Sequence, residues 1–188
     1  MDRKQEILEI ATELVQTHGY SAFSYNDLSE RLGISKASIH HHFASKADLG
    51  LAVAEKCLHD IASALTASKQ ASSDPWKQLE GYFAIVSSDI KSQERICPAG
   101  STQADINVVP EPMAKKMVEL VQFIISWVSD IIQDGREQGV MTFSGTPREQ
   151  AELIFSAAQG AMQYGRANGE KRGQGVLKQI KAMMKPAN

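Results

Sequence analysis

Cysteine is scarce in this chain of 188 residues, which contains only Cys57 and Cys97. Two cysteines are too few for a disulfide framework, and they lack the CxxC spacing that is typical of zinc sites. We therefore expect neither a fold held together by disulfides nor a bound metal ion.

Long apolar runs are also missing. The most apolar window, residues 118–128, is interrupted by Glu119, Gln122 and Ser126, whereas a membrane-spanning helix needs about 20 consecutive apolar residues. Residues 1–6 (MDRKQE) lack the hydrophobic core of a signal peptide. These absences predict a soluble, cytoplasmic protein without a membrane partner.

A large excess of charge of one sign is absent as well, because the formal net charge is only −2. The chain as a whole is therefore not a general binder of nucleic acid. The local distribution differs from the average: Arg31, Lys36 and Lys46 have no acidic residue between them, and His40, His41 and His42 lie in the same window. This window predicts a small cationic face on a weakly acidic protein.

What the sequence does contain is apolar residues with helical spacing. Hydrophobic residues make up 43% of the chain, which is enough for a well-formed core. No segment alternates as a strand would, so the pattern predicts an all-α fold with about nine helices. The expected helices cover residues 7–18, 25–32, 36–43, 46–66, 75–90, 102–106, 113–137, 148–168 and 173–184.

The segment from Tyr25 to Phe43 is typical of a helix-turn-helix. Ser24 and Asp27 have the spacing of a capping box, Gly33-Ile34-Ser35 forms a tight turn, and Ser35 caps the following short helix. Such a second helix enters the DNA major groove with its N-terminal side chains at the base edges. The exposed candidates for base contact are Lys36, Ala37, Ser38 and His40. From the residues alone, a plain corner between two helices is an equally good interpretation.

The run GYSAFSYNDLSERLGISKASIHHHFASKADL, from Gly19 to Leu49, resembles the N-terminal domain of the TetR/AcrR family of bacterial regulators. The matching features include Gly33-Ile34-Ser35, the pair His42-Phe43 and the run from Ser45 to Leu49. The resemblance implies a DNA-binding domain at residues 1–48 and a ligand-binding and dimerisation domain at residues 49–188. It also implies a homodimer that binds a palindromic operator of double-stranded DNA and releases it when a small molecule binds.

The resemblance assigns roles to individual residues. Lys36 and Ser38 match recognition-helix contacts, Lys46 matches a phosphate contact at the start of the next helix, and Ser24 and Tyr25 match phosphate contacts at the second helix. His40 departs from the family, which usually has tyrosine there, so a contact from this position would depend on pH. We expect His41 to lie near DNA as well, and we expect His42 to pack inward with Phe43.

No catalytic constellation follows residue 50, because His59 is the only histidine there and no glycine-rich phosphate loop follows a strand. The sequence therefore predicts a protein that is not an enzyme and has no cofactor. Large apolar or polarizable side chains could together line an adaptable ligand cavity, although each taken singly is more typical of ordinary core. These candidates are Phe83, Met113, Met117, Phe123, Trp127 and Met162.

Cys97 is the sharper candidate for effector sensing. The helical pattern breaks at Cys97-Pro98, so a thiolate there would lie at the N-terminus of a following helix, with Arg95 nearby. The position resembles a branch of the family in which some members respond to electrophiles or oxidants through such a thiol. A small buried residue without chemistry is the equally weighted alternative, and Cys57 is expected only to pack.

The last two helices are the expected dimer interface. One carries a small-residue face (Ala151, Ala158, Gly160, Ala161, Gly165) and the other an apolar stripe (Leu177, Ile180, Met183, Met184). Two such pairs across a two-fold axis would form a four-helix bundle. Packing of the same faces within one chain is the alternative.

The sequence thus predicts a one-component regulator, a repressor released by a small-molecule or thiol-reactive effector. Two alternatives remain at this stage. A helical protein could bind small molecules without binding DNA, or a reactive cysteine could make the chain an enzyme.

Overall fold

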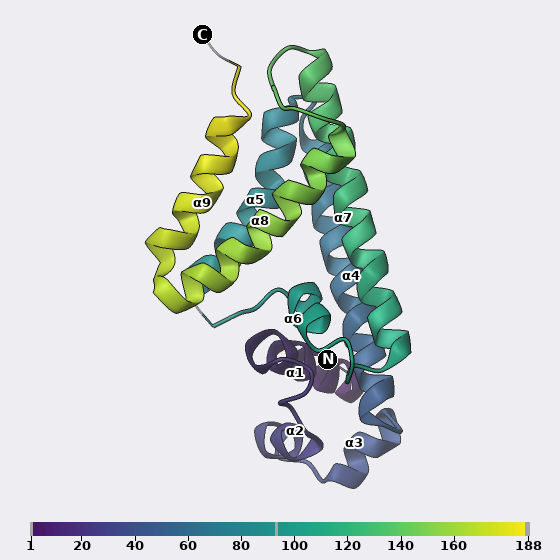
Figure 1. Ribbon diagram of the computed structural model, residues 1–188. Helices are drawn as coiled ribbons and strands as arrows, with labels where there is room; N and C mark the ends of the chain where they lie inside the picture. Colours follow the sequence, from purple (N-terminus) through teal and green to yellow (C-terminus); the bar gives the residue numbers. More distant parts are fainter. Residues whose placement is uncertain (1, 93, 187–188) are drawn as a thin grey trace. The chain divides into compact units, whose positions relative to one another are not determined.

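The computed structural model describes residues 2–92 and 94–186, and within these ranges the chain forms nine α-helices and no strand (Figure 1). The all-α prediction is confirmed. None of the described helices is long and apolar enough to cross a bilayer. The helices are α1 (Arg3–His18), α2 (Tyr25–Leu32), α3 (Lys36–His42), α4 (Lys46–Ala71), α5 (Pro75–Ser92), α6 (Pro98–Ala104), α7 (Glu111–Glu137), α8 (Pro147–Asn168) and α9 (Glu170–Met183).

Local sequence signals fix several helix ends. Helix α2 begins at the Ser24–Asp27 capping box and ends at Gly33, whose φ of +63° is a left-handed conformation that favours glycine. Helix α3 begins under Ser35, whose hydroxyl oxygen accepts a hydrogen bond from the Ser38 N–H at 3.2 Å. These boundaries were predicted from the sequence and are confirmed.

Other boundaries differ from the prediction. The short helix expected at residues 102–106 exists with other bounds: α6 begins at Pro98 and ends at Ala104, because proline at the first helical position has a suitable φ and needs no hydrogen-bond acceptor. Helix α4 continues to Ala71 rather than ending near Ala67. The last turn of α4 is stabilised by a residue of α5, since the Gln78 side-chain amide donates to the Lys69 carbonyl.

Contacts divide the chain into two compact units. The first unit contains Met1–Asp60 and Ile96–Leu120, and the second contains Ile61–Arg95 and Val121–Asn188. The boundary expected from the sequence, between residues 48 and 49, therefore falls inside α4, and the first unit also includes α6 and the start of α7.

The core of the first unit fixes the arrangement of its short helices. Ile7 and Ala11 of α1, Leu28 of α2, Ile39 of α3 and Leu49 of α4 are all fully buried. Burying each of the leucine and isoleucine side chains contributes about 1.5–3 kcal/mol. This apolar cluster gives α2 and α3 a rigid frame.

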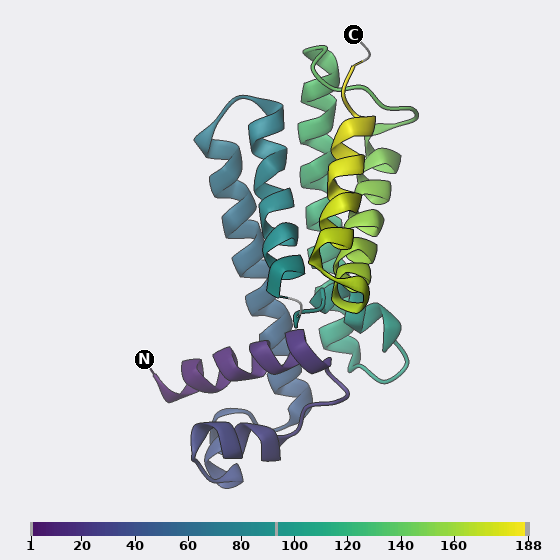
Figure 2. The same cartoon turned by 90° about the vertical axis from the view of Figure 1, so that its left-hand side faces the viewer.

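In the second unit, α8 and α9 lie side by side (Figure 2). Their backbones approach closely at Gly165 and Gly173, because a Cβ on Gly173 would lie 2.6 Å from the Ala161 carbonyl oxygen and 3.0 Å from the Gly165 Cα. The small-residue face is thus used within the chain. Most residues of that face, and two of the α9 stripe, pack within the chain because they are buried inside the second unit: Ala151, Ala158, Ala161, Gly165, Leu177 and Met184. Gly160 of α8 and Met183 of α9 are exposed, and the dimer expected through the last two helices stays a prediction.

Candidate nucleic-acid interface

The turn between α2 and α3 is held by both backbone and side chain. The Ser29 hydroxyl donates to the Ile34 carbonyl at 2.5 Å, and the Ile34 N–H donates to the Ser29 carbonyl at 3.2 Å. Leu28 and Ile39 are 0% exposed and pack beneath the turn. The helix-turn-helix geometry is therefore built into the chain before any DNA is bound.

The structure leaves the outer face of α3 exposed. Lys36, Ala37, His40 and His41 are exposed, and Ser38 is half-buried. His42 is half-buried beside the buried Phe43, as the sequence predicts. The first turn of α3 therefore offers a cation, a small apolar side chain and a hydroxyl on one short surface, which suits recognition of base edges in a major groove.

The side chains of Tyr25 and His40 lie next to each other at the end of α3. Their rings lie 4.7 Å apart between centroids, and the Tyr25 hydroxyl donates to the Phe43 carbonyl at 3.0 Å. Burial, helped by the charges of Asp48 and Tyr20, raises the pKa of Tyr25 to about 12, so its hydroxyl keeps its proton at neutral pH. The Nδ1 of His40 lies 3.1 Å from the Ala44 carbonyl and must therefore carry the proton.

Ser24 is also engaged within the chain. The Asp27 carboxylate accepts hydrogen bonds from the Ser24 hydroxyl at 2.9 Å and from the Ser24 N–H at 2.6 Å. These bonds, the side-chain one first, lower the pKa of Asp27 below its usual value. The sequence predicts that Ser24 and Tyr25 contact phosphate, whereas their side-chain hydroxyls donate to internal acceptors in this structure.

Lys46, the first residue of α4, stands over two aromatic rings. Its Nζ lies 4.5 Å from the centroid of Tyr20 and 4.7 Å from that of Phe23. Burial lowers the pKa of the ammonium group, and the negative charge of Asp27 opposes this shift. The helix start is capped by Ser45, whose hydroxyl oxygen accepts from the Asp48 N–H at 3.1 Å.

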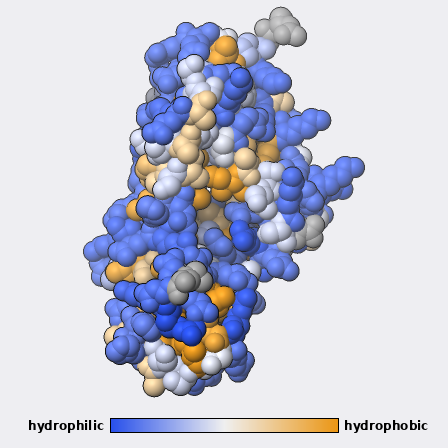
Figure 3. All heavy atoms as spheres, turned by 180° about the vertical axis from the view of Figure 1, so that it is seen from behind, coloured by the Kyte–Doolittle hydropathy of each residue, from blue (hydrophilic) through white to orange (hydrophobic). Residues whose placement is uncertain are grey.

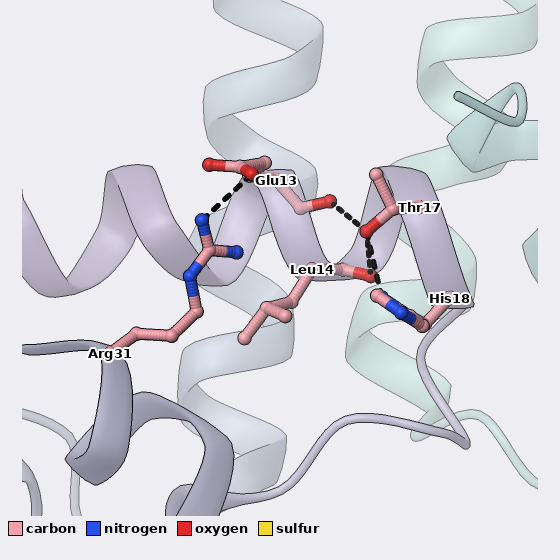
Figure 4. A network of polar contacts seen from close by, with 5 residues as sticks. All are labelled: Glu13, Leu14, Thr17, His18 and Arg31. Atoms are coloured by element: carbon pink, nitrogen blue, oxygen red, sulfur yellow. Dashed lines mark hydrogen bonds and ion pairs between the residues drawn. The ribbon is translucent and has the colours of Figure 1, made fainter. Parts of the chain in front are cut away.

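Two cations of the first unit have contacts that the sequence did not indicate. Lys4 places its Nζ 5.5 Å from the centroid of Phe43, beside the end of α3. Arg31 of α2 donates to the Glu13 carboxylate of α1 at 2.9 Å (Figure 4). Arg31 therefore links the two helices, and Lys4 is a further candidate for contact with phosphate.

The candidate ligand residues belong to both units. Cys97, Met113 and Met117 lie in the first unit, and Phe83, Phe123, Trp127 and Met162 lie in the second. All are buried except Cys97 and Phe123, which are half-buried. Trp127 stands out because its indole Nε1, in a side chain only 7% exposed, has no hydrogen-bond acceptor among the described residues.

Cys97 is the residue directly before α6, in a segment bound to the end of α1. The N–H of Ile96 donates to the Gln16 carbonyl at 2.6 Å, and the Ser21 hydroxyl donates to the Asp105 carboxylate at 2.9 Å. Residues on both sides of Cys97 thus touch the region that leads into α2. In the second unit, Arg95 pairs with Asp89 at 3.7 Å, and Cys57 is buried as expected for a packing residue.

Comparison with known proteins agrees with this geometry. A sequence profile described as "Bacterial regulatory proteins, tetR family" matches residues 7–53, the stretch that holds the helix-turn-helix. The chain is 23% identical over 163 residues to the HTH-type transcriptional repressor NemR of Escherichia coli K12, covering 85% of this chain and 82% of that protein. It is 43% identical over 54 residues to the repressor AcnR of Corynebacterium diphtheriae, 28% of that protein.

Solved structures extend the likeness to the whole fold. A TetR-family regulator from Agrobacterium tumefaciens superposes with a TM-score of 0.92 at 28% identity, covering 97% of each chain. The reduced form of NemR from E. coli has the same fold, with a TM-score of 0.82 at 22% identity over all of both chains. These relatives are transcriptional regulators rather than enzymes, which disfavours both alternatives left by the sequence. Residues 7–53 thus match the DNA-binding domain of the TetR family of bacterial regulatory proteins, and the chain as a whole has the fold of these proteins and is a DNA-binding transcriptional regulator.

Proposed function

We propose that the chain is a repressor that binds a palindromic operator as a homodimer and leaves the DNA in response to an effector. The observation that carries the proposal is the exposed start of α3, where Lys36 and Ala37 follow the Ser35 cap on a buried frame. Repression is supported by the names of the relatives from E. coli and C. diphtheriae, which are both described as repressors.

Lys36 and Lys46 have different roles in this proposal. Lys36 donates to a guanine edge, while Ala37 allows close approach or contacts a thymine methyl group. On DNA binding, the Lys46 ammonium group leaves the Tyr20 and Phe23 rings and contacts a phosphate. The positive end of the α4 dipole also stabilises the phosphate charge. One residue then sets the sequence preference and the other adds affinity for any duplex.

The proposed dimer uses the outward face of α8 and α9. Large apolar side chains remain exposed there, with Leu153 at 55%, Tyr164 at 46% and Met183 at 65%. Gly160 and Gly175 share the exposed surface and allow another helix to approach. A two-fold axis at this face is needed because two recognition helices must reach major grooves about 34–36 Å apart.

We propose Cys97 as the effector-sensing residue. A group added to the thiol enlarges the start of α6, whose flanking residues Ile96 and Asp105 are bonded to Gln16 and Ser21. Loss of these bonds shifts the region before α2 and favours the conformation that binds DNA weakly. A reversible ligand that pairs with the Trp127 indole N–H is the competing form of the same regulation.

The DNA-binding proposal is tested on duplexes selected from a random pool by the wild-type protein. We expect Lys46→Ala to weaken binding to every duplex and to reduce the salt slope by about 0.9, the loss of one phosphate contact. Lys36→Ala should instead reduce discrimination at particular base pairs by about 1–3 kcal/mol. Lys69→Ala, an exposed lysine on α4, is the control. Unchanged binding by both variants would overturn the assignment.

A further inference from the structure

The second unit contains a groove between α5 and α9 that the proposed function does not use. Its volume is about 810 Å³, within the range of small-molecule sites, about 300–1,000 Å³. Both walls belong to the same compact unit. Figure 3 shows apolar side chains reaching the surface in the upper part of the molecule, bordered by hydrophilic ones.

The floor of the groove is apolar and well fixed. Trp76, Phe83 and Leu177 line it, and Phe83 and Leu177 are buried. The Trp76 indole N–H donates to the Val140 carbonyl at 2.8 Å, which anchors the ring. The half-buried Trp76 ring and the exposed side chains of Ala84 and Ala182 supply the hydrated apolar surface above this base, from which an apolar ligand body can displace water.

The groove is elongated because α5 and α9 form its two long sides. The two helices run in opposite directions, as two contacts between them show. Glu80 of α5 pairs with Lys181 of α9 at 2.7 Å, and farther along α5 the Ser87 hydroxyl donates to Gln174 Oε1 at 3.0 Å. Gln174 Nε2 donates back to the Ser87 carbonyl at 3.1 Å. From Trp76 to Ser87 the α5 wall extends about 16 Å at 1.5 Å per residue, which suits a long rather than a compact ligand.

The rim of the groove is positively charged. Lys178, Lys181 and Lys185 line it, against the single carboxylate of Glu80. Lys181 is engaged with Glu80 and also lies 4.9 Å from the Phe83 ring centroid. Among the described residues, neither Lys178 nor Lys185 has a carboxylate within ion-pair distance. Two lysines on this rim are thus left to attract an anion.

We propose that this groove binds an amphipathic organic anion, with an elongated apolar body on the Trp76–Phe83–Leu177 floor and a carboxylate at Lys178 and Lys185. The apolar floor favours a ligand with an apolar body. The two lysines without an ion-pair partner among the described residues favour a ligand with a negative charge. This inference rests on the proposed function only in assigning such an anion as an effector. The binding step itself is independent of DNA.

Dodecanoate is the probe, compared by calorimetry with dodecanol and dodecylamine, which have the same chain length and no negative charge. We expect dodecanoate to bind most tightly. Lys178→Gln/Lys185→Gln should weaken its binding by about fivefold. Ala84→Phe, at an exposed position on the groove wall, should abolish binding by filling the groove. Lys69→Gln/Lys91→Gln removes the same charge elsewhere and should bind like wild type.

Binding of dodecanol or dodecylamine as tight as that of dodecanoate would overturn the proposal, as would unchanged dodecanoate binding by Ala84→Phe. The effector role is judged separately on a duplex selected by the wild-type protein. Release of this duplex by dodecanoate from wild type, but not from Ala84→Phe, supports that role, and retention of the duplex at saturating dodecanoate overturns it. If the wild-type protein selects no duplex, the proposed function is contradicted. The calorimetric experiment then still tests whether the groove binds the anion.

Discussion

At the level of single residues, several side chains of the proposed DNA-binding surface already have partners within the chain. The Tyr25 hydroxyl donates to the Phe43 carbonyl, and the Ser24 hydroxyl and N–H donate to the Asp27 carboxylate. The bond between Tyr25 and the Phe43 carbonyl is neutral and contributes only about 0.5–1.5 kcal/mol, whereas the bonds from Ser24 to the Asp27 carboxylate are charge-assisted. A phosphate oxygen, which accepts stronger charge-assisted bonds, can therefore compete for the Tyr25 hydroxyl more readily than for the Ser24 donors.

His40 should contribute to DNA binding from the exposed end of α3. Its Nδ1 lies 3.1 Å from the Ala44 carbonyl, and its ring lies beside that of Tyr25. We expect His40→Ala to weaken binding to the selected duplex, because the variant loses one polar contact with the DNA backbone. His59→Ala, at an exposed position on α4, is the control. Equal affinity of His40→Ala and wild type would contradict the role.

The sequence predicted which residues lie on this surface better than it predicted their contacts. Lys36, Ala37 and His41 are exposed on α3 because the cap and turn that orient them are local signals. The contacts of Lys46 with Tyr20 and Phe23 arise only when the loop before α2 meets the start of α4. Lys4 was missed for the same reason, since its neighbour Phe43 is far away in the chain.

At the level of helices, caps were predictable and helix lengths were not. Serine and glycine at the ends of α2, and serine at the start of α3, act on their own neighbours, so a linear pattern contains them. The end of α4 depends on Gln78 of the next helix. The apolar pattern did not place the start of α6, because the helix is too short to show a period, although the break at Cys97-Pro98 indicated a following helix.

The α2 cap should give the protein an acid-sensitive helix. The folded state lowers the pKa of Asp27, so its stabilising effect is complete above the usual aspartate pKa and is lost as pH falls through the lowered value. We expect Asp27→Asn to melt at a lower temperature than wild type at pH 7. The difference should vanish in strongly acidic buffer, where wild-type Asp27 is also neutral.

Thermal melts across pH check this expectation. Glu30→Gln, an exposed acidic residue in the same helix, removes one charge without touching the cap and should follow the wild-type curve. A constant difference between wild type and Asp27→Asn at every pH would show that the carboxylate's charge is not responsible.

Helix α6 should transmit modification of Cys97 to the DNA-binding helices. N-ethylmaleimide adds a bulky group at the residue before α6, and we expect wild type and Cys57→Ser to lose affinity for the selected duplex by about 5–150-fold, a typical coupling. Cys97→Ser should keep its affinity. The circular dichroism spectrum of each variant should remain that of a helical protein before and after treatment with N-ethylmaleimide. Loss of DNA by Cys97→Ser to the same extent would favour a reversible ligand instead.

At the level of the whole molecule, two neighbouring positions on α8 separate dimer contacts from internal packing. Gly160 is exposed and a Cβ there meets nothing within 4 Å, whereas Ala161 is buried. We expect Gly160→Arg to yield folded monomers with much weaker operator binding. Ala161→Arg should instead destabilise the α8–α9 pair, because arginine has no room there.

Sedimentation and thermal melts distinguish the two outcomes. A Gly160→Arg variant that stays dimeric would place the interface elsewhere on the chain. The sequence pattern could not make this distinction, because small residues at helical spacing predict a close partner helix without saying whether that helix belongs to the same chain.

The contact between Gly165 and Gly173 also limits how this chain can evolve. Each glycine lies against the other's backbone and against Ile90, so a single methyl group at either position needs room that backbone atoms already occupy. Neither residue has a side chain that could contact DNA or an effector, yet neither can be exchanged alone without separating two helices. We therefore expect substitutions at exposed positions of α9 to change a partner or ligand preference while the hairpin stays intact.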